Sequence, residues 1–65
     1  MKILVNGAWR DTDAPELAAA LVELGYGDAV VSTALNGEFV AAKARPRTRL
    51  EDGDRLEVLA PMQGG

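Results

Sequence analysis

Two Asn-Gly pairs constrain the fold of this 65-residue chain more than any other feature of its sequence. They stand at 6–7 and 36–37, and each separates two short runs that can form strands. Asn followed by Gly is the pair best suited to the positive φ angles of a two-residue hairpin turn. The sequence therefore predicts two β-hairpins, over 1–11 and 30–42.

The segment between the hairpins is predicted to be a helix, over 14–24. Asp13, followed three residues later by Glu16, resembles a capping box at the helix start, and Gly25 suits the position just past a helix end. Four apolar residues recur at helical spacing and define the face that we expect to be buried: Leu17, Ala20, Leu21 and Leu24.

A fifth strand is predicted at 55–59, after the turn Asp52-Gly53, with Leu56 and Val58 facing the core. The order β-β-α-β-β-β predicts an α+β fold of the β-grasp (ubiquitin-like) type. In this roll, one helix packs on one face of a mixed sheet and the other face meets water. We expect the domain to span 1–59 and to be followed by a flexible tail, 60–65, that ends in Gly-Gly.

The residue inventory limits the chemistry that the chain can perform. It contains no histidine and no cysteine, and its single serine, Ser32, has no histidine partner. No side chain is thus suited to act as nucleophile or base near neutral pH, and the usual metal ligands are absent. The sequence therefore predicts a protein that is not an enzyme by itself.

Charge and hydropathy limit the partners and the location. A formal net charge of −3 argues against a nucleic-acid binder, which needs a basic face. The apolar run at the N-terminus is too short for a signal peptide, and no stretch reaches the roughly 20 apolar residues of a membrane span. We therefore expect a cytoplasmic protein with no nucleic-acid or membrane partner.

Three local motifs together resemble the ThiS family, the ubiquitin-like sulfur carrier proteins of thiamine biosynthesis. They are the opening Met-x-Ile-x-Val-Asn-Gly, the central ALNGEFV and the final LEDGDRLEVLAPMQGG. The most specific is the Asp-Gly-Asp turn before a strand that runs directly into Gly-Gly. Family members often carry Val-Pro-Arg after the central hairpin, where this chain has Val40-Ala41-Ala42-Lys43.

This resemblance implies that the carboxylate of Gly65 is the site of sulfur attachment. An adenylating partner enzyme would activate it with ATP, a sulfur-donating protein would allow its conversion to a thiocarboxylate, and a thiazole synthase would receive the sulfur. The domain itself would bind no cofactor. An α-carboxyl group, whose ordinary pKa is roughly 3.5, is ionised at neutral pH and needs no general base.

The tail would thread into partner sites through Pro61, Met62, Gln63 and Gly64. Six extended residues reach about 20 Å. The body would dock through Leu4 and Leu59, which are expected to point away from the helix on paired strands, although scattered surface apolarity is an alternative for both. Trp9 is expected to be a half-buried strand residue.

Three other functions fit the same sequence. The first is a sulfur carrier of the molybdopterin synthase type, the second a ubiquitin-like modifier conjugated to lysines, and the third an interaction module whose sheet is the functional part. The role of the basic stretch is also open between a solvated loop, a contact with an acidic enzyme groove and a nucleic-acid site. Its residues are Lys43, Arg45, Arg47 and Arg49.

Overall fold

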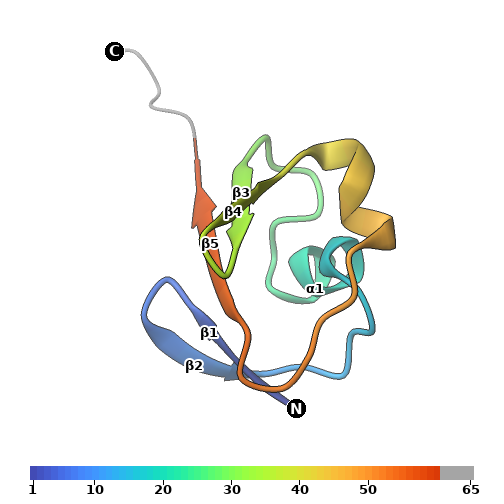
Figure 1. Ribbon diagram of the computed structural model, residues 1–65. Helices are drawn as coiled ribbons and strands as arrows, with labels where there is room; N and C mark the ends of the chain where they lie inside the picture. Colours follow the sequence, from blue (N-terminus) through green and yellow to red (C-terminus); the bar gives the residue numbers. More distant parts are fainter. Residues whose placement is uncertain (61–65) are drawn as a thin grey trace.

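The computed structural model describes residues 1–60 of the chain. Its elements are β1 (Lys2–Val5), β2 (Ala8–Asp11), α1 (Leu17–Glu23), β3 (Ser32–Leu35), β4 (Glu38–Val40), the 3₁₀ helix η1 (Ala42–Arg47) and β5 (Arg55–Leu59). The predicted order of strands and α-helix is confirmed, and η1 is added between β4 and β5 (Figure 1).

The five strands form one mixed sheet in the order β2-β1-β5-β3-β4. β5 lies in the centre, parallel to β1 and antiparallel to β3, so the last strand joins the two hairpins. α1 and η1 lie together on one side of the sheet (Figure 1). This arrangement confirms the predicted α+β β-grasp roll.

Both hairpin turns have the backbone geometry that the Asn-Gly pairs predicted. Asn6 and Asn36 have φ angles of 49° and 51°, and Gly7 and Gly37 have φ angles of 85° and 86°. Positive φ at both central residues is the mark of the type I′ turn, whose twist matches that of the flanking strands. The turns therefore set the register of each hairpin.

The core lies between α1 and the sheet. On the strands it is formed by alternate residues, among them Ile3 and Leu56, which are fully buried. On α1 the predicted apolar face is confirmed: Leu17, Ala20 and Leu21 are buried and Leu24 packs against them. Within residues 1–60, the buried hydrophobic residues are Ile3, Val5, Ala14, Leu17, Ala20, Leu21, Val31, Leu50, Leu56 and Val58.

The end of α1 also follows the sequence signal. Gly25 has a φ of 96°, and its N–H donates to the carbonyl of Val22 at 3.1 Å. The N–H of Tyr26 donates to the carbonyl of Leu21 at 2.8 Å. These two bonds form a Schellman motif, which satisfies the last carbonyls of the helix and favours glycine at the left-handed position.

The start of α1 differs from the prediction. The helix begins at Leu17 instead of Ala14, and its N-cap is Glu16 instead of Asp13. Glu16 has an extended backbone, with φ −146° and ψ 166°, and its Oε1 accepts a hydrogen bond from the N–H of Ala19 at 2.7 Å. The predicted capping box is therefore wrong, because its last residue acts as the cap itself.

Long-range pairing explains why the residues before Leu17 are not helical. The N–H of Leu17 donates to the carbonyl of Thr48 at 2.9 Å, and the carbonyl of Pro15 accepts from the N–H of Leu50 at 3.2 Å. These two groups are thereby used by the segment that leads into β5. Because backbone groups that pair across the fold are held in an extended geometry, the helix starts one turn later.

Candidate functional site

Most of the predicted reactive segment lies outside the described residues. β5 ends at Leu59, and of the tail only Ala60 is described. The predicted attachment residue Gly65 and the predicted threading residues Pro61, Met62, Gln63 and Gly64 lie beyond it. Their roles remain predictions, and the described part of the site is the face of the sheet around the end of β5.

Leu4 and Leu59 lie on the same face of the sheet, the one directed away from α1. Leu4 stands between the buried Ile3 and Val5, and Leu59 follows the buried Val58, so alternation places both on the opposite side. Leu59 is 68% exposed and Leu4 is half-buried. The expected orientation of both residues is therefore observed.

Leu4 and Leu59 also line one shallow hollow of about 460 Å³. β1 and β5 pair in parallel with Leu4 opposite Arg55, so the two leucines lie at different heights along neighbouring strands. Asn6 and Glu57 contribute polar groups to the same hollow. The surface next to the end of β5 thus combines apolar side chains with polar and charged ones.

Two aromatic residues extend this apolar surface, and the prediction for one of them was wrong. Trp9, expected to be half-buried, is 59% exposed. It stands directly opposite Leu4 in the β1–β2 register, and directly opposite residues share a face. Phe39 is 73% exposed and lines a second hollow, of about 150 Å³, together with Leu59.

We call the sheet face that carries Leu4, Trp9, Phe39 and Leu59 the outer face. Its aromatic members could have been placed from the sequence, because the Asn-Gly turn fixes the register that puts Trp9 opposite Leu4. Phe39 faces Ala34 in the β3–β4 register, and Ala34 in turn faces the exposed Glu57 of β5. Both hairpins therefore contribute to the outer face.

The basic stretch divides into one structural residue and three solvent-exposed ones. The guanidinium of Arg45 donates from Nε to Oγ1 of Thr33 at 3.0 Å and from Nη2 to the carbonyl of Val31 at 2.6 Å. It thereby holds η1 against β3. Lys43, Arg47 and Arg49 are exposed, and no side-chain hydrogen bond joins them to another residue within 1–60.

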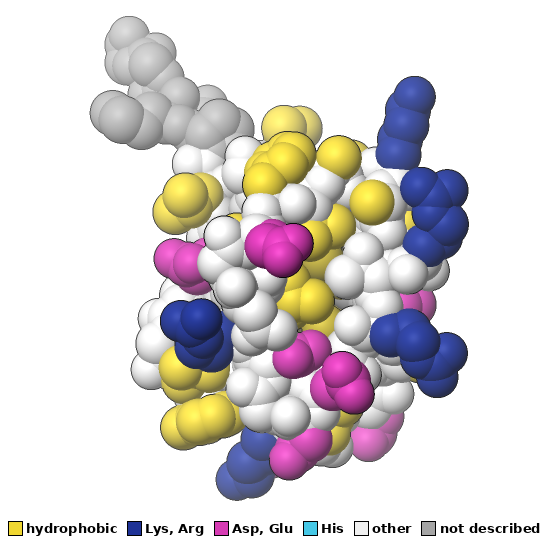
Figure 2. Space-filling model, in the orientation of Figure 1, with side chains coloured by type: hydrophobic (Ala, Val, Ile, Leu, Met, Phe, Trp, Pro, Cys, Tyr) yellow, Lys and Arg dark blue, Asp and Glu magenta, His cyan; other side chains and the backbone are white. Residues whose placement is uncertain are grey.

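Basic side chains gather along the edge of the molecule that η1 and the following segment form (Figure 2). Elsewhere on the visible face, acidic side chains are scattered among hydrophobic and other ones, with isolated basic side chains at the left and at the bottom. The basic edge belongs to the helix side of the fold. It is therefore separate from the outer face.

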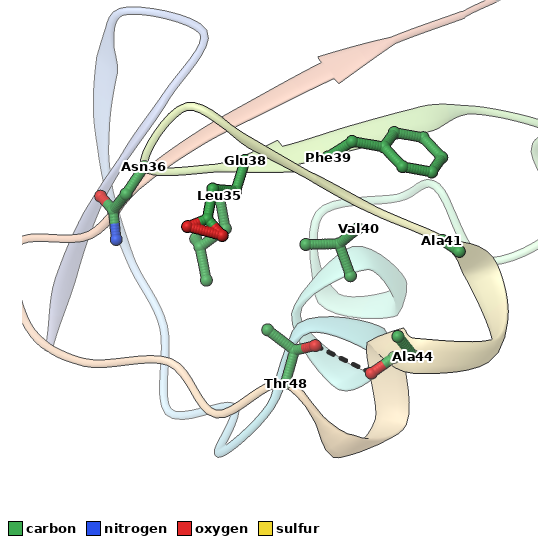
Figure 3. A pocket seen from close by; sticks show the side chains of 8 residues that line it. All are labelled: Leu35, Asn36, Glu38, Phe39, Val40, Ala41, Ala44 and Thr48. Carbon is green, nitrogen blue, oxygen red and sulfur yellow. Dashed lines mark hydrogen bonds between the residues drawn. The ribbon is translucent and has the colours of Figure 1, made fainter.

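A further hollow, of about 430 Å³, lies between β4 and η1 (Figure 3). Val40 and Ala44 line it, and Oγ1 of Thr48 donates to the carbonyl of Ala44 at 2.8 Å, which closes the last turn of η1. Leu4 and Leu59 do not line this hollow. Phe39 lines it and so connects it to the edge of the outer face.

Neither a metal centre nor a membrane-spanning helix is found within the described part of the chain. Residues 1–60 contain no group of three or more aspartate, glutamate, histidine or cysteine side chains that could hold a metal ion. In the same residues, no helix is both long and apolar enough to cross a membrane.

Comparison with known proteins decides the family. The ThiS family model matches residues 3–65, nearly the whole chain. The chain belongs to the ThiS family. The resemblance carried by the three sequence motifs is thereby confirmed.

Solved structures of ThiS proteins have the same fold. The crystal structure of the thiamine biosynthesis protein ThiS from Geobacter metallireducens matches with a TM-score of 0.82 and 35% identity, over 100% of both chains. The solution structure of a thiamine biosynthesis protein from the same organism matches with a TM-score of 0.79 and 32% identity. That alignment covers 100% of this chain and 88% of the other.

One curated relative is a much longer protein. A thiazole synthase from Paramagnetospirillum magneticum AMB-1 is 35% identical over 66 residues, an alignment that covers all of this chain. The chain spans about a fifth of the length of that relative. A ThiS-like segment therefore occurs there in one polypeptide with a much longer remainder.

Proposed function

We propose that this protein is a sulfur carrier of thiamine biosynthesis whose reactive group is the carboxylate of Gly65. The observation that carries the proposal is the ThiS family match over residues 3–65, which includes Gly64 and Gly65. The protein acts as a cosubstrate: partner enzymes supply the catalytic groups, and the chain supplies a main-chain carboxylate. The lack of histidine and cysteine is compatible with this division.

Activation begins when the ionised carboxylate attacks the α-phosphorus of ATP on the adenylating enzyme. A bond forms between a carboxylate oxygen and this phosphorus, and the bond from phosphorus to the leaving pyrophosphate breaks. The product is an acyl-adenylate, whose carbonyl carbon is a much better electrophile than a carboxylate carbon. The enzyme's task in this step is to position the reactants and to stabilise the developing charge.

Sulfur transfer follows at the same carbon. A hydrosulfide ion attacks the acyl-adenylate, AMP leaves, and the chain ends in a thiocarboxylate. When a protein persulfide is the donor, attack gives an acyl disulfide, and a thiol must reduce it to release the thiocarboxylate. The resulting covalent carrier presents a sulfur nucleophile at the end of its own backbone.

Docking through the outer face supports this chemistry energetically. Holding six backbone residues in one conformation inside a partner's site costs on the order of 6–12 kcal/mol, at about 1–2 kcal/mol per residue. Burial of exposed apolar side chains such as Leu59 against the partner offsets part of this cost. The tail then enters the partner's site while the folded body stays outside.

The proposed acceptor of the sulfur is a thiazole synthase. The similarity to a segment of the Paramagnetospirillum thiazole synthase supports this partner. In that relative the ThiS-like segment and the remainder share one polypeptide, so the two parts are kept at a high local concentration. Between separate polypeptides, the same encounter would depend on the docking surface.

Complementation tests the pathway. A strain that lacks its own ThiS, and therefore requires thiazole, receives this protein together with its cognate adenylating enzyme and thiazole synthase. We expect growth without thiazole for the intact chain and none for a chain that lacks Gly65. Equal growth for both chains would contradict the proposal, and lysine-linked adducts without growth would favour a protein modifier.

A further inference from the structure

The side of β5 that faces β1 carries a regular series of hydrogen bonds. The N–H of Leu4 donates to the carbonyl of Asp54 at 2.9 Å, and the N–H of Asn6 donates to the carbonyl of Leu56 at 3.0 Å. β1 then ends at Val5, and its chain turns away into the first hairpin. The next residue of β5 on this side, Val58, therefore has no strand beside it.

The side chain of Asn6 takes the place of the missing strand. Its Nδ2 donates to the carbonyl of Val58 at 3.1 Å, and its Oδ1 accepts from the N–H of Val58 at 2.8 Å. A primary amide carries one acceptor and two donors, so it can bond both backbone groups of one residue as a strand would. Within residues 1–60, the bonds to Val58 are the last ones on this side of β5.

The geometry of the turn explains why an asparagine can do this. Asn6 has a left-handed backbone, φ 49°, which only Gly, Asn and Asp adopt with ease. Glycine has no side chain to reach Val58, and an ionised aspartate has no donor for its carbonyl. Among these residues, asparagine alone both fits the turn and completes both bonds.

We infer that Asn6 is a positioning residue, which fixes the direction in which the chain leaves the sheet. This inference rests on the proposed function. Val58 lies two residues before Ala60, so its two bonds to Asn6 hold the base of the tail on one side while β3 holds Leu59 on the other. When the base of the tail is fixed, the adenylating enzyme meets the tail from one defined direction relative to the docked body.

The second hairpin provides a matched control. Asn36 has the same backbone conformation, φ 51°, and its side chain also bonds to the region of β5. Its Nδ2 donates to Oδ1 of Asp54 at 3.0 Å, and its Oδ1 accepts from the N–H of Arg55 at 2.9 Å. These bonds lie at the start of β5, at the opposite end of the strand from the tail.

The test compares Asn6→Gly with Asn36→Gly. Each substitution keeps the turn, because glycine accepts positive φ without strain, and each removes two side-chain hydrogen bonds without a change of charge. In the free protein, we expect Asn6→Gly to raise the amide hydrogen exchange rate of Val58 by about tenfold. Asn36→Gly should leave Val58 unchanged and raise the exchange rate of Arg55 instead.

Adenylation provides the functional readout. At saturating ATP, Asn6→Gly should lower kcat for acyl-adenylate formation by about tenfold, since a misplaced reactant slows the step. KM for the carrier should stay within about twofold, because the apolar side chains of the outer face are unchanged. Asn36→Gly, with a similar loss of hydrogen bonds, should keep the kcat of the unmodified chain.

The outcomes separate the two hypotheses. Equal kcat values for the two variants, or unchanged exchange at Val58 in Asn6→Gly, would overturn the role of Asn6. Failure of the unmodified chain to form any adenylate would overturn the proposed function instead. Amide exchange in the free protein would then still decide whether Asn6 holds the end of β5.

Discussion

The two faces of the sheet are built from the same strands, but their side chains differ in exposure to solvent. On the inner face, Leu56 and Val58 are 0% and 5% exposed and pack against α1. On the outer face, Leu59 is the direct neighbour of Val58 and is mostly exposed. One strand can therefore hold the fold together with alternate residues and leave the others free to meet a partner.

The largest expected effect belongs to the inner face. Leu56→Ala should lower the free energy of unfolding by about 2–5 kcal/mol, because it removes a fully buried side chain and leaves a cavity. Leu59→Ala, three residues later on the same strand, should change it by about 0.5 kcal/mol or less. Urea denaturation measures the free energy of unfolding of both variants. Equal losses in the two would contradict the distinction between the faces.

A smaller loss of stability is expected at Arg45, whose guanidinium bonds to Thr33 and Val31 on the helix side of the sheet. Arg45→Met keeps most of the aliphatic stem but removes the hydrogen bonds to Thr33 and Val31, so stability should fall by about 1–2 kcal/mol. Arg47→Met, two residues later at an exposed position, should stay within about 0.5 kcal/mol. Thermal unfolding measures the Tm of each variant, and equal Tm values would contradict the structural role of Arg45.

The outer face should affect binding rather than folding. Leu59→Asp should leave the free energy of unfolding nearly unchanged and weaken the affinity for the adenylating enzyme by roughly tenfold, because it places a charge in an apolar contact. Val22→Asp is a matched control, since Val22 is 66% exposed but lies on α1. Calorimetric titration that finds the same affinity for both variants would remove Leu59 from the docking surface.

Features that depend on local backbone preference could be predicted from the sequence. The two Asn-Gly turns and Gly25 at the end of α1 each require a positive φ, and the residues that adopt it are few. Alternation in β5 likewise placed Leu56 and Val58 in the core. Such signals are contained within a few residues, so they can be interpreted without knowledge of the rest of the fold.

Features that depend on distant partners could not be predicted. The first turn expected for α1 is replaced by an extended segment, because Leu17 and Pro15 bond to residues more than 30 positions away. The role of Arg45 required knowing that η1 packs beside Val31. The residues next to Arg45 in the sequence do not indicate which distant carbonyl its guanidinium will bond to.

The candidate site was predictable to a similar extent. The three motifs identified the ThiS family, and the role of Gly65 that this family implies stays a prediction. The face on which Trp9 lies follows from the Asn-Gly turn, but its exposure does not. The bonds of Asn6 to Val58 depend on how β1 and β5 meet. The Asn-Gly pair predicts a turn, but only the assembled sheet shows which backbone groups the asparagine side chain bonds to.

Mass spectrometry after enzymatic activation tests the central claim most directly. The full chain is incubated with ATP, sulfide and its adenylating enzyme, and its mass and fragment ions are compared with those of a reaction without ATP. We predict a gain of about 16 Da, the replacement of one oxygen by sulfur, confined to Gly65. An unchanged mass, or the same gain at any other residue, would contradict the account.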